Sequence, residues 1–319
     1  MSEIQPQRTR PLLARIFLSP EEPRLRAGWR LLIQTLLLFV FGAVIFIVSG
    51  FLGTFLKGSL SLIRDQIVNF LIITSSVYVA RRWLDKRSFE SLGLKLDQRT
   101  LRDILAGIGI TFVQMGFIYV LMLGLGWLTF KGFAWEFDPV NVVISNVVIF
   151  FIVFIFVAWN EELLTRGYHL QTIASGINLF WGVIISSSIF GLLHLGNPNA
   201  TWVSAAGIFF AGIYLAYAYI RTKQLWLSIG LHIGWNFFEG VVFGFRVSGL
   251  DIYALTRIDV HGPVLWTGGA FGPEAGLIVL PSLALGALLI YLYTKKRANK
   301  LSSPFMQDNN LETEPLNKA

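Results

Sequence analysis

The 319-residue sequence contains no cysteine, which excludes disulfide bonds, thiolate nucleophiles and cysteine-ligated zinc sites. Charged residues are also scarce: they make up 14% of the chain, whereas soluble globular proteins carry roughly 25%. Any catalysis must therefore use carboxylate, imidazole, hydroxyl or amide groups. Hydrophobic residues are abundant at 54%, and the mean hydropathy is +0.62. This composition is typical of a protein embedded in a lipid bilayer.

The net charge of +7 does not indicate a nucleic-acid partner, because Lys and Arg stand at the ends of hydrophobic runs rather than on one basic domain. We predict that these residues contact membrane lipids and that the protein binds no nucleic acid. The first hydrophobic run begins after residue 30, follows six Arg residues and lacks a small-residue cleavage site. It is therefore predicted to be a retained membrane span rather than a signal peptide.

Long apolar runs recur along the whole chain. A helix needs about 20 mainly apolar residues to cross a hydrocarbon core about 30 Å thick. The runs that qualify are 31–56, 65–82, 103–129, 140–160, 179–195, 202–220, 225–245 and 275–294. The sequence thus predicts an all-α, polytopic transmembrane helical bundle of about eight spans. The fourth run continues into a polar segment, 160–172, that is also compatible with a helix.

Basic residues are distributed unequally between alternate connections. One set carries 19 Lys and Arg residues in total: 1–30, 81–102, 221–223 and 295–300. The other set carries five: 57–64, 129–139, 196–201 and 245–275. By the positive-inside rule, both termini and the 81–102 connection face the cytoplasm. The basic cytoplasmic loops and the absence of a transit peptide favour a bacterial plasma membrane.

The chain is predicted to form one membrane domain, residues 29–296. It lies between a basic cytoplasmic tail at 1–28 and a polar cytoplasmic tail at 297–319. Residues 81–102 mix basic and apolar side chains. This segment either lies along the anionic inner leaflet or forms a solvated connection.

Ionisable side chains gather in three clusters at or inside predicted spans. Such residues are costly in a membrane and usually mark an ion path, a proton relay or a reaction centre. In chain order, the clusters are Glu161, Glu162 and Arg166; Phe190 and His194; and His232, Asn236 and Glu239. Glu162 and Arg166 are four residues apart and can pair on one helix face. Glu161 is rotated by about 100° from Glu162, so its carboxylate can remain free.

Chain distances suggest that the clusters converge. Glu161 precedes Gly176 by 15 residues and His194 follows it by 18. An antiparallel hairpin that turns near Gly176 would place both at a similar depth, roughly 22–27 Å from the turn. His232, in a neighbouring span, could complete the set. Because the turn is predicted to be cytoplasmic, either the 160–175 segment lies partly along the membrane or the site opens toward the other face.

These residue types suit hydrolysis of a peptide bond. A carboxylate beside imidazoles can deprotonate a water molecule, and a His or Asn donor can stabilise the oxyanion that forms. Two imidazoles and a carboxylate, from His194, His232 and Glu161, could instead hold zinc or another divalent metal. Residue types alone leave metal-dependent and metal-free catalysis equally open.

Other polar residues have simpler interpretations. Glu239 is either a supporting acid or a side chain that reaches toward the membrane surface. His169 follows the first cluster on an amphipathic segment, and His261 lies in a polar loop, so neither is predicted to be a ligand. The serines at 186–188 are typical of close helix packing, and no GxSxG turn supports a serine nucleophile.

The ordered motifs EExxxR (Glu161, Glu162, Arg166), FxxxH (Phe190, His194) and HxxxN (His232, Asn236) resemble a known family. It is the CAAX prenyl protease type II and bacteriocin-processing (CPBP, or Abi) family of intramembrane endopeptidases. The resemblance covers roughly 141–240. It implies a helical membrane core and proteolysis of a peptide or protein substrate, which is prenylated in the eukaryotic members.

The resemblance also implies roles for individual residues. Glu161 corresponds to the water-activating base, and Glu162 and Arg166 to its supporting pair. His194 is similar to the catalytic His of the second motif. His232 and Asn236 are similar to the pair that stabilises the oxyanion or binds metal, since both metal-dependent and metal-free mechanisms have been put forward for the family.

Two other classes of function remain open at this stage. A proton-coupled carrier could use the same carboxylates and imidazoles as a relay, although the sequence shows no internal repeat. A non-catalytic immunity or scaffold protein would retain its function without Glu161.

Overall fold

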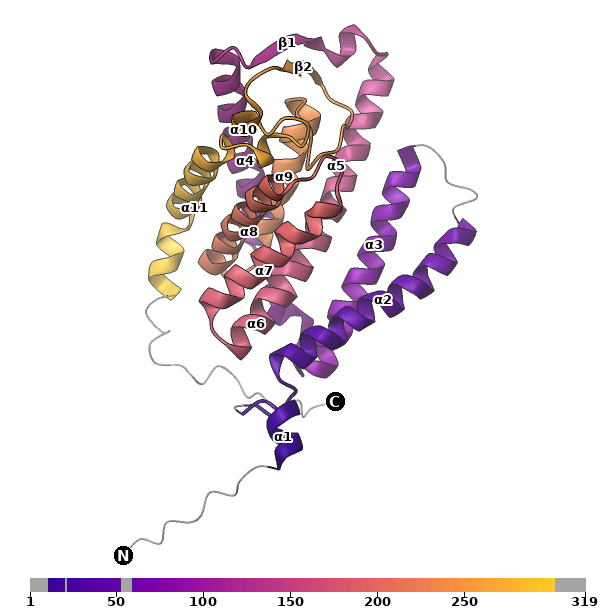
Figure 1. Cartoon of the computed structure of the whole chain (residues 1–319), viewed down its shortest axis with the longest axis vertical. Helices are drawn as coiled ribbons and strands as arrows, with labels where there is room; N and C mark the ends of the chain where they lie inside the picture. The colour runs from indigo at the N-terminus through magenta and orange to yellow at the C-terminus, as the bar shows by residue number, and fades with distance from the viewer. Residues whose placement is uncertain (1–10, 21, 53–58, 302–319) are drawn as a thin grey trace, which may run out of the picture.

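The computed structural model describes residues 11–20, 22–52 and 59–301. Most of the two predicted tails, including Arg8, Arg10 and residues 302–319, lies outside the described residues. The described chain folds into a helical bundle (Figure 1). The predicted all-α polytopic fold is therefore confirmed.

The first half of the chain contains four long helices, α2 to α5, joined by shorter helical segments. The elements are α1 (Leu12–Phe17), α2 (Ala27–Leu52), α3 (Ser59–Val79), η1 (Ala80–Leu84), η2 (Phe89–Leu92), α4 (Thr100–Gly124), α5 (Val140–Glu162), η4 (Leu163–Leu170) and α6 (Gln171–Gly176). α2 packs against α3, and α3 packs against α5. From α5 to α6 the chain forms one 37-residue helical run, so the predicted helical continuation after residue 160 is present.

The second half contains helices of very different lengths. The elements are α7 (Leu179–Leu193), η5 (His194–Gly196), α8 (Trp202–Thr222), α9 (Trp226–Asn236), η6 (Phe237–Val242), α10 (Val264–Thr267), η7 (Pro273–Ala275) and α11 (Val279–Leu301). Asn178 directly precedes α7, and its side chain accepts a hydrogen bond from the Trp181 amide at 3.0 Å and so caps the helix. α6 and α7 form the antiparallel hairpin predicted around Gly176.

Six helical runs in the described residues are long and apolar enough to cross a membrane. They correspond to the first six predicted spans. The seventh predicted span is α9 followed by η6, and the eighth is α11, whose C-terminal end is basic. The estimate of about eight spans therefore holds as an approximation.

Two short strands cover one end of the bundle, and the hydrophobicity pattern did not predict them. β1 (Leu128–Phe133) pairs antiparallel with β2 (Thr256–Val260), and the 3-10 turn η3 (Ala134–Glu136) follows β1. The pairing joins the connection before α5 to the long connection before α11. Figure 1 shows this strand pair at the upper end of the molecule, opposite the α6–α7 turn.

Glycines bring α4 and α9 into backbone contact. A Cβ atom at Gly230 would lie 2.3 Å from the Ile104 carbonyl oxygen, and one at Gly234 would lie 2.1 Å from Thr111 Oγ1. Small residues allow this close approach between membrane helices. His232 lies between the two glycines, so the contact fixes the position of its backbone.

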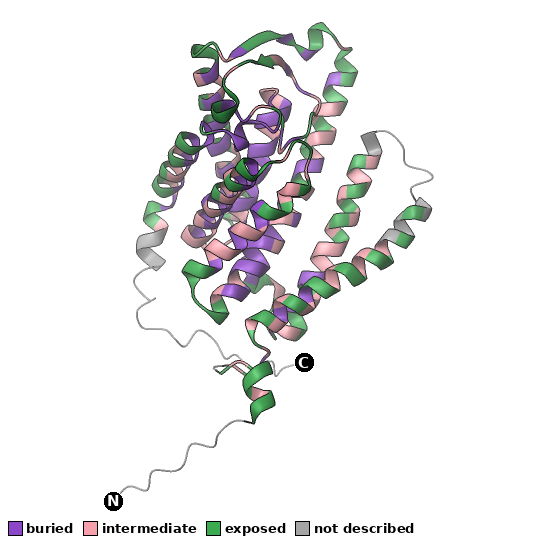
Figure 2. Ribbon diagram, in the orientation of Figure 1, coloured by how far each residue is buried: buried purple, intermediate pink, exposed green. Residues whose placement is uncertain are grey.

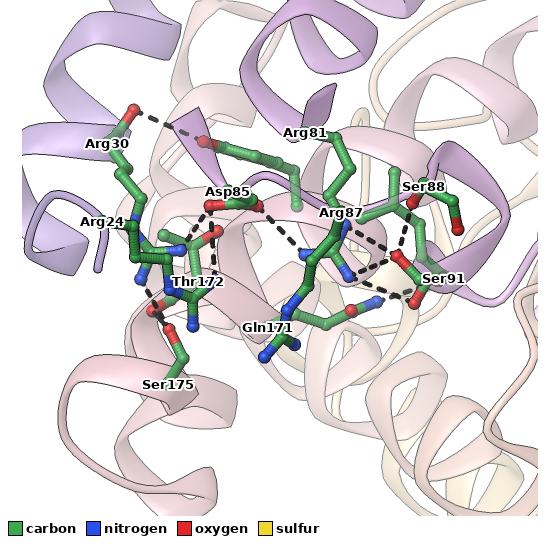
Figure 3. A network of polar contacts seen from close by, with 12 residues as sticks. Arg24, Arg30, Arg81, Asp85, Arg87, Ser88, Ser91, Gln171, Thr172 and Ser175 are labelled. Carbon is green, nitrogen blue, oxygen red and sulfur yellow. Dashed lines mark hydrogen bonds and ion pairs between the residues drawn. The ribbon is translucent and has the colours of Figure 1, made fainter. Parts of the chain in front are cut away.

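A polar network joins α2 to the chain around α3 and α6 (Figure 3). Asp85 is fully buried and bonds to Arg30 and to Arg81, whose Nη1 lies 3.0 Å from Asp85 Oδ2. Arg30 Nη2 also donates to Ser175 Oγ at 2.8 Å. We call this set, with Arg24, the Asp85 network. Figure 2 shows that α2 and α3 are mostly exposed or half-buried, whereas buried residues gather at the centre of the bundle.

Candidate active site

The first cluster lies where α5 changes from an α-helix to the π-helical segment η4. Short π-helical segments occur frequently at functional sites because they redirect side chains within a helix. Glu162 ends α5 and is completely buried. The Thr165 hydroxyl donates back to the Glu161 carbonyl oxygen and satisfies one backbone group in this transition.

Glu162 joins the first cluster to the third. Its Oε1 accepts a hydrogen bond from Arg166 Nη1 at 2.9 Å and one from His232 Nδ1 at 2.9 Å. Arg166 is 1% exposed and also donates to Thr165 Oγ1 at 2.8 Å and to the Gly212 carbonyl oxygen at 3.1 Å. The Glu162–Arg166 pair thus forms as its four-residue spacing indicates, and it holds His232 in place.

Phe190 contacts the other members of the site through its ring. The Arg166 guanidinium lies 4.3 Å from the ring centroid, a distance at which a cation is attracted to an aromatic face. The rings of His194 and His232 meet Phe190 edge-on at 4.7 Å and 6.3 Å between centroids. The FxxxH spacing therefore places an aromatic ring between two imidazoles and a buried cation.

Glu161 faces both imidazoles across a gap. Its Oε2 lies 3.9 Å from His194 Nε2 and 3.7 Å from His232 Nε2, and it makes no hydrogen bond. His194 Nδ1 donates to the Phe190 carbonyl oxygen at 2.8 Å, and His232 Nδ1 donates to Glu162. In neutral rings both Nε2 atoms are consequently acceptors. These three acceptors surround one gap, and a water molecule there can donate hydrogen bonds to two of them at a time.

The same three atoms have the chemistry of zinc ligands, and both rings are oriented by a bond at Nδ1 as in many metal sites. Among the described residues, no group of three His, Asp or Glu side chains is already gathered around a metal position. The three atoms are therefore available either to a water molecule or to a metal ion.

Asn236 supplies an amide to the same cavity. It stands one turn after His232 and is 6% exposed, and its side chain makes no hydrogen bond with another described residue. Its Nδ2 is therefore available as a donor to a negatively charged oxygen.

The site lies in a cavity of about 650 Å³. Its polar end contains Glu161, His194, His232 and Asn236. The wall that α3 and α5 provide is mainly apolar, with Ile73, Phe150, Phe154 and Val157, and carries Asp65 and Gln66 on α3. The cavity therefore places a hydrolytic group of residues next to a hydrophobic surface.

Sequence reasoning missed Glu274, which η7 brings to the cavity wall. Glu274 Oε1 accepts from Trp235 Nε1 at 3.0 Å, and Oε2 accepts from the Ser248 amide at 2.8 Å and its hydroxyl at 2.7 Å. The sequence did offer one signal for Glu274, since it is the single charged residue in the stretch 262–282.

The remaining polar residues have different surroundings. Glu239 is completely buried, so the alternative that its side chain reaches the membrane surface is wrong. Asn160, also missed, is buried on the cavity lining and its amide has no partner among the described residues. His169 lies beside Gln34, at 3.4 Å, and His261 is exposed; neither lines the cavity.

Comparison with known proteins identifies a family whose model matches the part of the chain that carries the site. Residues 143–238 match the family model described as "Type II CAAX prenyl endopeptidase Rce1-like". The family predicted from the motifs is confirmed for this region. The matched segment contains all three motifs and nearly coincides with the predicted range 141–240.

A curated relative of this CPBP-family region is "Putative membrane peptidase YdiL" of Bacillus subtilis (strain 168). The two sequences are 32% identical over 78 residues, which cover 24% of this chain and 30% of the relative. The match spans less than a third of either protein. Together, the family and the relative support a membrane peptidase.

Proposed function

We propose that the protein is an intramembrane endopeptidase that hydrolyses a peptide bond with a water molecule activated by Glu161. The observation that carries the proposal is the convergence of Glu161 Oε2 and the Nε2 atoms of His194 and His232 on one gap beside the cavity. This gap is where a substrate carbonyl in the cavity would meet an ordered water.

In this mechanism, Glu161 removes a proton from the water while the water oxygen attacks the carbonyl carbon. The carbonyl oxygen becomes an oxyanion, and Asn236 Nδ2 donates a hydrogen bond to it. The C–N bond then breaks, and the proton held by Glu161 passes to the leaving nitrogen. The products are a carboxylic acid and an amine.

Glu162 and Arg166 act by positioning. The carboxylate of Glu162 fixes the His232 ring through Nδ1, so that Nε2 points toward Glu161. Arg166 balances the charge of Glu162 inside the protein. The pair therefore maintains the gap without contacting the substrate.

The apolar wall between α3 and α5 suits a peptide that carries a hydrophobic anchor, such as a prenyl group or a membrane segment. Our proposal places the protein in a bacterial plasma membrane, surrounded by lipids, with both termini in the cytoplasm. The charge difference between alternate connections supports this orientation.

The test is cleavage of internally quenched fluorogenic peptides, prenylated and unprenylated, by purified protein in micelles. We expect cleavage by the wild type and at least a 10³-fold loss in Glu161→Gln, because general-base catalysis and water positioning disappear together. Asp251→Asn is the matched control, since this carboxylate also lines the cavity but its side chain is 80% exposed. No cleavage by folded wild type would contradict the proposal and favour a carrier or scaffold.

A chelator arm separates the two mechanisms. The water mechanism predicts unchanged activity after treatment with a chelator and dialysis. Loss of activity that zinc or another divalent metal restores would instead assign Glu161, His194 and His232 as metal ligands.

A further inference from the structure

The two histidines of the site are followed by connections at the same end of the bundle. His194 directly follows α7, in η5, and His232 lies in α9, which continues into η6. α7 begins at the α6–α7 turn, and the connections that follow η5 and η6 lie at the opposite end, which β1 and β2 cover (Figure 1).

These connections are locked together and line the cavity. Asn197 Nδ2 donates to the Ser248 carbonyl oxygen at 3.0 Å, and the Gly249 amide donates to the Phe271 carbonyl oxygen at 2.7 Å. Ser248 is also bound to Glu274. The connection after η5 and both ends of the long connection between η6 and α11 contribute cavity residues. The cavity thus extends toward the end of the bundle that β1 and β2 cover.

The opposite end is closed by packing. Leu92, Leu163, Tyr168 and Leu225 form part of one core cluster and are 0% exposed. No described residue from 81–102, the α6–α7 turn or 222–225 lines the cavity. The Asp85 network lies at this same end of α2 and α3 (Figure 3). Water and substrate therefore reach the site from the other end of the bundle.

The continuous run from α5 to α6 decides between the two arrangements left open by the sequence. It is 37 residues long, and α6 packs against α7. Glu161 stands 15 residues before Gly176, about 22 Å along the helix from the α6–α7 turn. The 160–175 segment therefore belongs to the bundle, and the cavity beside Glu161 is lined by connections from the other end of the bundle.

Charge assigns the two ends to the two sides of the membrane. The end of the bundle that is closed by packing carries the set of connections with 19 Lys and Arg residues. The end toward which the cavity extends carries the set with five, and 196–201 in that set has none. We infer that the active site opens to the non-cytoplasmic face and takes a membrane-anchored peptide from the non-cytoplasmic leaflet. The substrate part of this inference rests on the proposed endopeptidase function, whereas the orientation does not. Exported peptides would be substrates, and prenylated C-termini of cytoplasmic proteins would not.

The absence of native cysteine permits a direct test of orientation. Three single substitutions report on three places: Asp251→Cys at the open end, Leu193→Cys on the cavity lining and Leu96→Cys in the 81–102 connection. All three wild-type side chains are more than half exposed. Intact bacteria that express each variant are treated with a membrane-impermeant maleimide before and after permeabilisation.

We expect Asp251→Cys and Leu193→Cys to be labelled in intact cells, at least tenfold more than Leu96→Cys, which should require permeabilisation. The reverse pattern would overturn the orientation. Labelling of Leu193→Cys only after permeabilisation, with Asp251→Cys labelled outside, would overturn the assignment of the cavity opening.

A second experiment tests the substrate. An acylated, internally quenched peptide that cannot cross the membrane is added to intact cells expressing wild type or Glu161→Gln. Cleavage by the wild type alone supports the inference. Cleavage only after permeabilisation would overturn it while leaving the endopeptidase function intact. No cleavage in either state, with the expected labelling, would retain the orientation but overturn the proposed function and with it the substrate.

Discussion

The substitution Glu162→Gln should destabilise the protein and inactivate it for separable reasons. Glu162 is 0% exposed and Arg166 is 1% exposed, so the charge of one is balanced inside the protein by the other. Removing one partner of a buried pair typically costs about 3–5 kcal/mol. Arg166 would keep its bonds to Thr165 and Gly212 and its contact with Phe190, so we expect about 3 kcal/mol, near the lower limit.

The double substitution Glu162→Gln/Arg166→Met distinguishes charge imbalance from a general packing defect. It removes both charges with little change in volume, and such replacements are often close to neutral. We therefore expect most of the lost stability to return, while activity stays at least tenfold low because His232 Nδ1 still lacks its carboxylate partner.

Stability is measured by unfolding purified protein in mixed micelles with increasing SDS, followed by circular dichroism. Activity is measured per folded molecule on the fluorogenic peptide. The control is Asp259→Asn, which breaks an exposed pair with Lys131 and should cost less than about 1 kcal/mol. The reasoning is refuted if the double variant is as unstable as Glu162→Gln, or if its activity returns together with its stability.

Three further substitutions test other parts of the structure. Asn236→Ala should lower kcat by about 10²-fold with little change in KM, because it removes an oxyanion donor; steady-state kinetics measures both. Asp85→Asn should cost about 3–5 kcal/mol in the SDS titration, because buried Arg30 and Arg81 lose their carboxylate, yet folded molecules should keep wild-type kcat. Gly234→Ala should cost about 1–3 kcal/mol and also lower kcat, because its Cβ would force α9 away from α4. Wild-type stability in either of the last two variants would contradict the packing described.

Local patterns in the sequence were sufficient to predict the motif clusters and many helices. Apolar runs of sufficient length identify spans, and a four-residue spacing places Glu162 beside Arg166 on any helix. Both features depend only on neighbouring residues, and both are present in the structure.

Contacts between distant segments could not be predicted in this way. The bond between Glu162 and His232 joins residues that are 70 apart and depends on how α9 packs against the rest of the bundle. Glu274 is held at the cavity by Ser248, which lies 26 residues earlier and is itself bound to Asn197 of another connection. The β1–β2 pair likewise forms between segments that, taken alone, read as connections. Periodicity describes which face of a helix is apolar but not which distant loop covers its end.

The Asp85 network has a mechanical consequence for the cavity. It fastens α2 and η1 at the closed end of the bundle, far from the apolar wall that α3 and α5 provide. The residues of the reaction stand instead on α5, η5 and α9, and α9 is held at backbone distance from α4. α3 is also held to α5 farther along its length, where Trp159 Nε1 donates to Thr74 Oγ1 at 2.9 Å and the Phe70 ring meets the Phe156 ring edge-on. The protein therefore separates the contacts that assemble its first helices from the contacts that orient the residues around the gap, so a change in the Asp85 network should affect stability more than it affects the reaction.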